Sequence, residues 1–170
     1  MLPITQKFCV YADSNHLKYR ILKENVDNHD IIETIEKGGT LSGMSLPEGA
    51  LLFFCPDESV TINYDCAQIP DEKQGAATSF ANKLNKRARF VRFLYDPEFR
   101  CLRAATDVFV GDSANSTVAG VKICEMLDLV RDVVKEIFPD IAKMLHGDRR
   151  SASVSDVMGN IDRLIRTKLE

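Results

Sequence analysis

The densest group of chemically active side chains is a basic segment between residues 83 and 103. It carries seven basic residues and two acidic ones, Asp96 and Glu98, which leaves a local excess of five positive charges. A basic surface of this kind binds phosphate groups or acidic side chains. The seven residues form a candidate anion-binding patch: Lys83, Lys86, Arg87, Arg89, Arg92, Arg100 and Arg103.

Three roles remain open for this patch. It could bind nucleic acid, it could bind an acidic protein surface, or it could be a solvated face of the fold. Side chains on paired strands can point to different faces, and the long stems of Lys and Arg often cover a sheet surface. The segment has no regular aromatic platform on which bases would stack, so we do not expect nucleic acid as the main partner.

The cysteines and histidines lack the spacing of metal ligands. The three histidines lie far apart, and the five cysteines form an odd set with no CxxC pair: Cys9, Cys55, Cys66, Cys101 and Cys124. Each cysteine falls in an apolar run, which is typical of reduced thiols packed as small apolar groups. The sequence therefore predicts no metal site and no cofactor.

No arrangement of acids, bases and nucleophiles predicts catalysis. Gly111 opens a polar loop between a predicted strand and a predicted helix, where phosphate-binding loops occur. The phosphate-loop pattern would need a second glycine and a lysine where the chain has Ser116 and Thr117. The acidic pairs lie at turns, helix starts and solvated helix faces, where carboxylates are favoured for local reasons. We therefore expect a protein that is not an enzyme and has no catalytic residues.

Length and composition predict one soluble globular domain. The 170 residues are 45% hydrophobic and 28% charged, with a formal net charge of -3. That charge is too small to imply a nucleic-acid or membrane partner by itself. No apolar run reaches the roughly 18 residues of a membrane span, and the first residues lack a signal-peptide pattern. We expect a cytoplasmic protein with no membrane partner.

The elements that would position these side chains begin with a predicted hairpin. Residues 6–12 and 17–23 are short runs rich in β-branched and aromatic residues. Residues 13–16, DSNH, have strong turn chemistry. In the second run apolar and basic residues alternate, which predicts one buried face and one solvated face.

A helix is predicted next, over residues 28–37. Asp27 suits its N-cap, and Gly38 follows where a helix would stop. The isoleucines of this segment would form its buried side. Residues 40–49, rich in Gly, Ser and Pro, are predicted to be a loop.

The middle of the chain predicts two further hairpins with a helix between them. Residues 50–55 are continuously apolar, and residues 60–66 alternate cleanly, which predicts a buried strand paired with a half-buried one. A helix starting near Pro70 follows, because proline is tolerated in a first turn. Residues 89–95 and 99–110 are predicted as the last pair of strands.

The longest periodic segment spans residues 117–145 and predicts a long helix with a wide apolar face. Ser116 or Thr117 would cap its start, and Pro139 would break or kink it after Phe138. One apolar stripe would pack on the sheet. The adjoining stripe, with Met126, Leu129 and Val133, is a candidate protein-interaction surface.

The domain is expected to end near residue 147. Residues 148–170 are predicted as a polar linker and an amphipathic helix, which would be marginal alone in water. This helix would dock on its own domain, on a second copy or on a client protein. Its apolar residues complete the candidate protein-interaction surface: Val154, Val157, Met158, Ile161, Leu164 and Ile165.

The order of predicted elements between residues 50 and 147 resembles the YbjN family of bacterial proteins. The resemblance rests on Pro70-Asp71-Glu72-Lys73 at a helix start, Asn82 and Asn85 near that helix's end, and Pro139 with Gly147 in the carboxy-terminal helix. It implies a type III secretion chaperone-like α+β fold and links to regulation. It supplies no catalytic residues.

Together these features predict an α+β fold, an antiparallel sheet of about six strands with helices packed on one face. We expect residues 1–147 to form a single α/β domain. The expected function is a non-enzymatic protein-binding module, a chaperone-like or regulatory adaptor that forms a homodimer. Two alternatives stay open, a small-ligand-binding or enzymatic domain and a nucleic-acid-binding regulator that uses residues 83–103.

Overall fold

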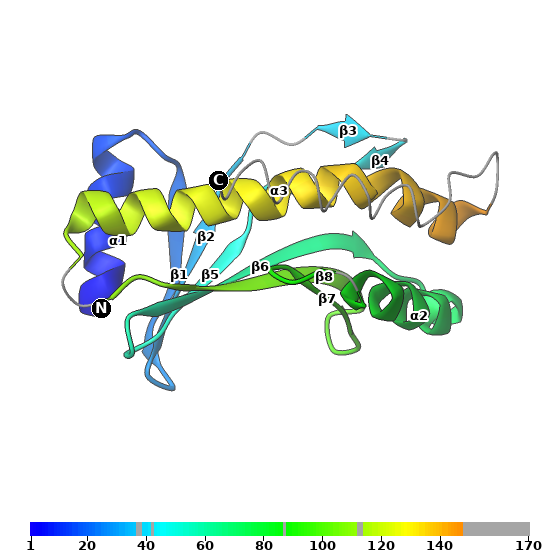
Figure 1. Ribbon diagram of the computed structural model, residues 1–170, viewed down its shortest axis with the longest axis horizontal. Coiled ribbons are helices and arrows are strands. Elements are labelled where there is room, and N and C mark those ends of the chain that lie inside the picture. Colours follow the sequence, from blue (N-terminus) through cyan, green and yellow to red (C-terminus); the bar gives the residue numbers. More distant parts are fainter. Residues whose placement is uncertain (37–38, 42, 87, 112–113, 148–170) are drawn as a thin grey trace. The chain divides into compact units, whose positions relative to one another are not determined.

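The fold is α+β, with a six-stranded antiparallel sheet, as the sequence predicts (Figure 1). The computed structural model describes residues 1–36, 39–41, 43–86, 88–111 and 114–147. The strands lie in the order β1 (Tyr19–Val26), β2 (His29–Thr34), β5 (Leu51–Phe54), β6 (Ser59–Gln68), β8 (Cys101–Phe109) and β7 (Arg92–Asp96).

The chain divides into two compact units, which we describe separately. The first unit comprises Met1–Lys37, Glu48–Tyr64 and Thr106–Asp128. The second unit comprises Gly38–Pro47, Asp65–Ala105 and Leu129–Glu170. The long strands β6 and β8 and the long helix contribute to both units.

The first unit begins with helix α1 (Pro3–Ser14), so the predicted strand over residues 6–12 is wrong. Its buried residues Ile4, Phe8 and Ala12 recur every four residues, which is the helical period. The Phe8 ring packs on that of Phe54 in β5, at 5.5 Å between centroids, so α1 lies against the sheet (Figure 1). The helix ends at Ser14, and the N–H of Leu17 donates back to the carbonyl oxygen of Ala12.

Strands β1 and β2 form a hairpin, so the predicted helix over residues 28–37 and its N-cap at Asp27 are also wrong. Asp27 and Asn28 have φ of 51° and 64°, both in the left-handed region. A tight two-residue turn with this backbone has the twist that a hairpin of two strands requires. Along β2, buried residues alternate with half-buried ones. That period of two buries Ile32 and is the period of a strand, not of the predicted helix.

The next elements follow the predictions more closely. Strands β5 and β6 pair in register from Leu51 with Asn63 to Phe54 with Val60, which confirms the hairpin predicted over residues 50–66. Within the stretch predicted to be a loop, a small separate hairpin joins β3 (Thr40–Leu41) and β4 (Met44–Ser45).

In the second unit, a short 3-10 turn η1 (Asp71–Lys73) leads into α2 (Gln74–Asn85), which confirms the helix predicted to start near Pro70. Its buried face includes Ala77, Phe80 and Leu84. The predicted strands over 89–95 and 99–110 are confirmed as β7 and β8, with shorter bounds.

The long helix is confirmed as α3 (Ser116–His146). Its first turn is capped by Asn115 rather than by Ser116 or Thr117, because the Asn115 Oδ1 accepts the N–H of Val118 at 2.9 Å. The helix continues through Pro139 without the predicted break. The predicted tail helix lies outside the described residues.

Candidate functional site

Strand β1 is the terminal strand of the sheet and the most exposed one in the described part of the chain. Seven of its eight residues are exposed, whereas the residues of β2 beside it alternate between half-buried and buried. A terminal strand presents backbone donors and acceptors on its outer side. Such an edge is a template on which another chain can pair.

Large apolar side chains gather at this edge. Ile21 is 37% exposed, Leu22 43% and Val26 42%. Leu17 and Ile35, which flank the paired strands, are exposed as well. Burying exposed apolar groups of this size against a partner lowers the free energy and so favours binding. We refer to residues 17–26 together with Ile35 as the β1 edge.

The hydrogen-bond ladder determines which backbone groups face outward. The N–H of Ile35 donates to the carbonyl oxygen of Lys18 at 2.8 Å. Tyr19 then lies opposite Thr34, and Ile21 lies opposite Ile32. Bonded and non-bonded pairs alternate in an antiparallel ladder, so the N–H and C=O groups of Tyr19 and Ile21 point away from β2.

The regular part of the β1 edge is short. The pairing with β2 shifts between Ile21 and Lys23 and again between Lys23 and Val26. Asn25 has φ of 50°, and its N–H donates to Asp30 Oδ1 at 2.7 Å rather than continuing a regular ladder. Such irregularities restrict edge pairing. Regular pairing is therefore available mainly over residues 18–21.

Basic side chains line one face of the β1 edge. Arg20 lies opposite Glu33, Lys23 lies opposite Ile31, and Lys18 lies beside Ile35. Glu33, Ile31 and Ile35 alternate with the buried residues of β2. The three basic residues opposite them therefore lie on the face of the sheet that is not buried. Arg20 forms an ion pair with Glu33 and remains 64% exposed.

A buried carboxylate fixes the hairpin to the amino-terminal helix. Asp30 Oδ2 accepts the Thr5 hydroxyl at 2.7 Å and the Leu2 N–H at 2.5 Å. Burial alone would raise the pKa of Asp30, but these bonds, the bond from Asn25 and the charged amino terminus hold it below its usual range. The position of the β1 edge thus depends on an ionised acid of β2 that accepts hydrogen bonds from the start of α1.

Two members of the candidate anion-binding patch form ion pairs within the chain. Arg103 is 11% exposed and binds two carboxylates, Asp65 at 2.5 Å and Asp96 at 2.7 Å. Arg100 lies 3.4 Å from Asp71. Lys83, Lys86, Arg89 and Arg92 are exposed, whereas Arg87 lies outside the described residues. The positive charge of Arg103 is therefore neutralised by Asp65 and Asp96 of the same chain.

The candidate protein-interaction surface on α3 has one accessible member in the described chain. Leu129 and Val133 are buried, and Met126 is half-exposed. The other six residues proposed for that surface, Val154, Val157, Met158, Ile161, Leu164 and Ile165, lie outside the described residues. The adjoining apolar stripe thus contributes chiefly to the core.

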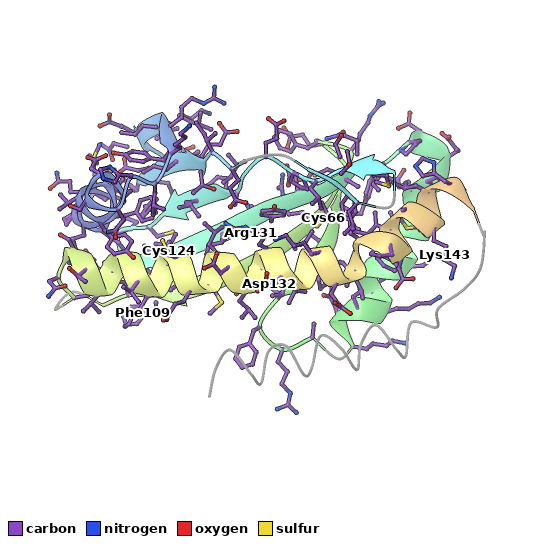
Figure 2. All side chains as sticks on the ribbon, turned by 90° about the horizontal axis from the view of Figure 1, so that it is seen from above. Cys66, Phe109, Cys124, Arg131, Asp132 and Lys143 are labelled. Atoms are coloured by element: carbon purple, nitrogen blue, oxygen red, sulfur yellow. The ribbon has the colours of Figure 1, made fainter. Side chains whose placement is uncertain are left out.

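The described cysteines include thiols whose pKa is raised by burial. Burial raises the pKa of the Cys101 thiol to about 12, and it raises the pKa of Cys66 as well. Cys66 lies on β6 and Cys124 on α3 (Figure 2). In the described part of the chain, no group of three His, Cys, Asp or Glu residues could hold a metal ion. No described helix is long and apolar enough to cross a membrane.

Comparison with known proteins identifies the architecture. The crystal structure of YbjN from E. coli, suggested to be a transcription regulator, superimposes with a TM-score of 0.52 over 81% of this chain and 94% of that chain. The chain has a YbjN-like fold. The aligned sequences are 8% identical, so the likeness concerns the fold alone. No protein-family model and no curated protein sequence matches the chain.

Sequence reasoning located β1 but missed its exposure. The alternation within residues 17–23 predicted one buried face, yet both Leu17 and Ile21 are exposed. The one signal for an open edge in the sequence is the set of basic residues among the apolar ones, Lys18, Arg20 and Lys23. The order of the strands in the sheet is what makes β1 terminal.

Proposed function

We propose that the protein is a non-enzymatic protein-binding module that acts as a regulatory adaptor or chaperone through its β1 edge. The observation that carries the proposal is the combination of a terminal strand, outward backbone groups at Tyr19 and Ile21, and exposed apolar side chains. These features provide hydrogen bonds and apolar contacts for an added strand.

The fold comparison is compatible with this role. YbjN is suggested to be a transcription regulator, and a regulator can act by binding another protein. Arg103 forms ion pairs with Asp65 and Asp96, which reduces the positive charge that residues 83–103 could offer to nucleic acid. Protein binding therefore has more support than the nucleic-acid alternative, whose signature would be a steep loss of affinity as salt rises.

Site-specific photo-crosslinking tests the proposal. A photoreactive amino acid replaces Leu22 in the full chain, and a matched variant carries it at Asn82, an exposed residue of α2. We expect discrete protein adducts with the first variant that the second does not form. Any adduct partner identified by mass spectrometry is then purified, and its affinity for the unlabelled chain is measured by calorimetry.

The affinities measured by calorimetry test whether the partner binds at the β1 edge. Leu22→Asp should weaken binding of the purified partner at least about tenfold, because a charge at a desolvated contact costs more than about 1.4 kcal/mol. Asn82→Asp should leave the affinity unchanged. If no purified protein binds the chain with an affinity that Leu22→Asp reduces, the β1 edge is not the functional surface.

Self-association is a separate proposal that rests on the amphipathic tail sequence. A homodimer held by residues 151–170 would lose mass in light scattering when they are deleted. Val157→Asp and Ile161→Asp should have the same effect, because each places a charge in the apolar stripe. A mass that none of these changes alters would show that the tail does not hold two copies together.

A further inference from the structure

We infer that the β1 edge binds an extended segment in which acidic and apolar residues alternate. The inference rests on the proposed protein-binding function and specifies its ligand. The segment adds to β1 as a seventh strand of the sheet, paired along residues 18–21. Its acidic side chains lie on one face of the enlarged sheet and its apolar side chains on the other.

The backbone of β1 can form hydrogen bonds with an added strand of any sequence. Tyr19 and Ile21 each direct an N–H and a C=O away from β2, as the bond from Ile35 N–H to Lys18 sets the ladder. An added strand would satisfy these four groups. The pairing shift after Ile21 ends the regular ladder, so the segment that pairs is short.

Specificity comes from the side chains of β1. Lys18, Arg20 and Lys23 lie on one face, because their neighbours Ile35, Glu33 and Ile31 all lie on the half-buried to exposed side of β2. Directly opposite residues in paired strands lie about 4.5 to 5.5 Å apart at Cβ. Acidic residues of the added strand would therefore lie next to Lys18 and Arg20, with Lys23 just beyond the paired stretch. Glu33 already partly neutralises Arg20, so Lys18 contributes most within the paired stretch, and Lys23 adds positive charge at its end.

The other face of β1 selects apolar residues. Tyr19 and Ile21 lie opposite Thr34 and Ile32, which are buried. The Tyr19 ring packs edge-on against Phe8 of α1, with 6.2 Å between centroids. An apolar side chain placed next to Tyr19 and Ile21 would extend this apolar surface outward.

The same charges disfavour a second copy of β1 as the occupant. Two antiparallel copies that keep equivalent faces together over residues 18–21 must place Arg20 opposite either Lys18 or Arg20 of the other copy. Like charges directly opposite each other destabilise a strand pair. The edge is therefore complementary to an acidic segment and not to itself.

The test uses the intact protein and three fluorescent peptides in polarisation titrations. One peptide alternates Asp or Glu with Val or Ile, a second replaces its acids with Lys, and a third has the composition of the first in a shuffled order. We expect the acidic alternating peptide to bind at least about tenfold more tightly than the other two. Its binding should slow hydrogen exchange at the Tyr19 and Ile21 amides.

Two matched pairs of variants locate the binding. Ile21→Pro removes an outward N–H without breaking a bond to β2 and should weaken binding at least about tenfold, whereas Ile21→Val keeps the N–H and should bind normally. The double variant Lys18→Glu with Lys23→Glu should prefer the basic peptide. Lys83→Glu with Lys86→Glu, on α2 and just after it, should change nothing.

The outcomes are separable. The inference is overturned if the acidic and basic peptides bind equally, or if charge reversal at Lys18 and Lys23 leaves the preference unchanged. It is also overturned if the Tyr19 and Ile21 amides are already protected without peptide and lose that protection when the chain is diluted, which would show that a second copy occupies the edge. If crosslinking at Leu22 still yields a purified partner in these cases, the proposed function stands and the assignment of its ligand fails.

Discussion

The side chain of Asn85 forms two hydrogen bonds with the backbone of a single residue, Phe93. Its amide nitrogen donates to the Phe93 carbonyl oxygen at 2.6 Å, and its amide oxygen accepts the Phe93 N–H at 2.7 Å. Phe93 lies in β7, the strand at the other end of the sheet from β1. The amide thus acts as a neighbouring strand would at this one position, and it occupies the two outward backbone groups of Phe93.

Replacing Asn85 should open the β7 edge. Asn85→Ala removes both bonds and is expected to cost about 1 to 3 kcal/mol of unfolding free energy, because the Phe93 groups are partly buried. The variant should also aggregate more readily on heating, which light scattering measures. Asn85→Asp keeps the acceptor for the Phe93 N–H but places a carboxylate oxygen against the Phe93 carbonyl oxygen, so it should not restore the lost stability at neutral pH.

Asn82→Ala is the matched control, since Asn82 is an exposed residue of the same helix. It should change stability by no more than about 0.5 kcal/mol. Equal losses in the Asn85 and Asn82 variants would contradict the proposed protection of the β7 edge.

The two edges show which part of the site could be predicted from sequence. The pattern of residues 50–66 has both an apolar run and a clean alternation, so local sequence alone determined that hairpin. Exposure of β1 depends on which strand ends the sheet, and that order arises from pairings between distant segments. The role of Asn85 depends in the same way on where α2 lies beside β7.

The two wrong elements have a common physical cause. Residues 6–12 are rich in β-branched and aromatic residues, but Ile4, Phe8 and Ala12 share one helical face that packs on the sheet. In β2, Ile31 and Ile32 are equally compatible with a helix, and the turn at Asp27 and Asn28 decides in favour of a strand. Tertiary packing overrode weak local propensity in both segments.

Gly120 should not tolerate a side chain. A Cβ at this position would overlap the ring carbons of Tyr11, because α1 and α3 approach closely there. Gly120→Ala is therefore expected to cost about 1 to 3 kcal/mol through overpacking, measured by chemical denaturation. The cost exceeds the helix propensity that alanine would gain.

Gly75 in α2 provides the matched control. A Cβ there would meet nothing within 4 Å. Gly75→Ala should leave stability unchanged or raise it by up to about 1 kcal/mol, since alanine is the better helix former. A Gly120→Ala variant as stable as Gly75→Ala would mean that α1 and α3 do not approach as closely as described.

The Asp30 anchor should make stability depend on acid pH. Its folded pKa is held below the unfolded value of about 3.9, so its stabilisation is complete above that value and is lost as pH falls through the folded pKa. At pH 7, Asp30→Asn should cost about 2 kcal/mol, because a charged acceptor with three donors is replaced by a neutral amide.

The difference in unfolding free energy between wild type and Asp30→Asn should shrink as pH is lowered below about 4. Thr5→Val removes one donor while keeping the charge, so an NMR titration of this variant should place the pKa of Asp30 higher than in the wild type. A difference that is constant from neutral to acid pH would show that the carboxylate charge does not hold α1.

Arg103 should behave as a structural cation and not as a ligand-binding one. Its guanidinium bonds to Asp65 through Nε and to Asp96 through Nη1, and it lies 5.5 Å from the centre of the Phe99 ring. Arg103→Met keeps much of the stem but leaves two partly exposed acids facing each other. The expected cost is about 1 to 3 kcal/mol, less than for a fully buried pair because Asp65 is 38% exposed.

The control is Arg89→Met, at an exposed residue of the same basic segment, which should cost no more than about 0.5 kcal/mol. If instead Arg103→Met leaves stability unchanged and abolishes binding of an acidic probe, the cation serves a ligand and the two carboxylates are incidental neighbours.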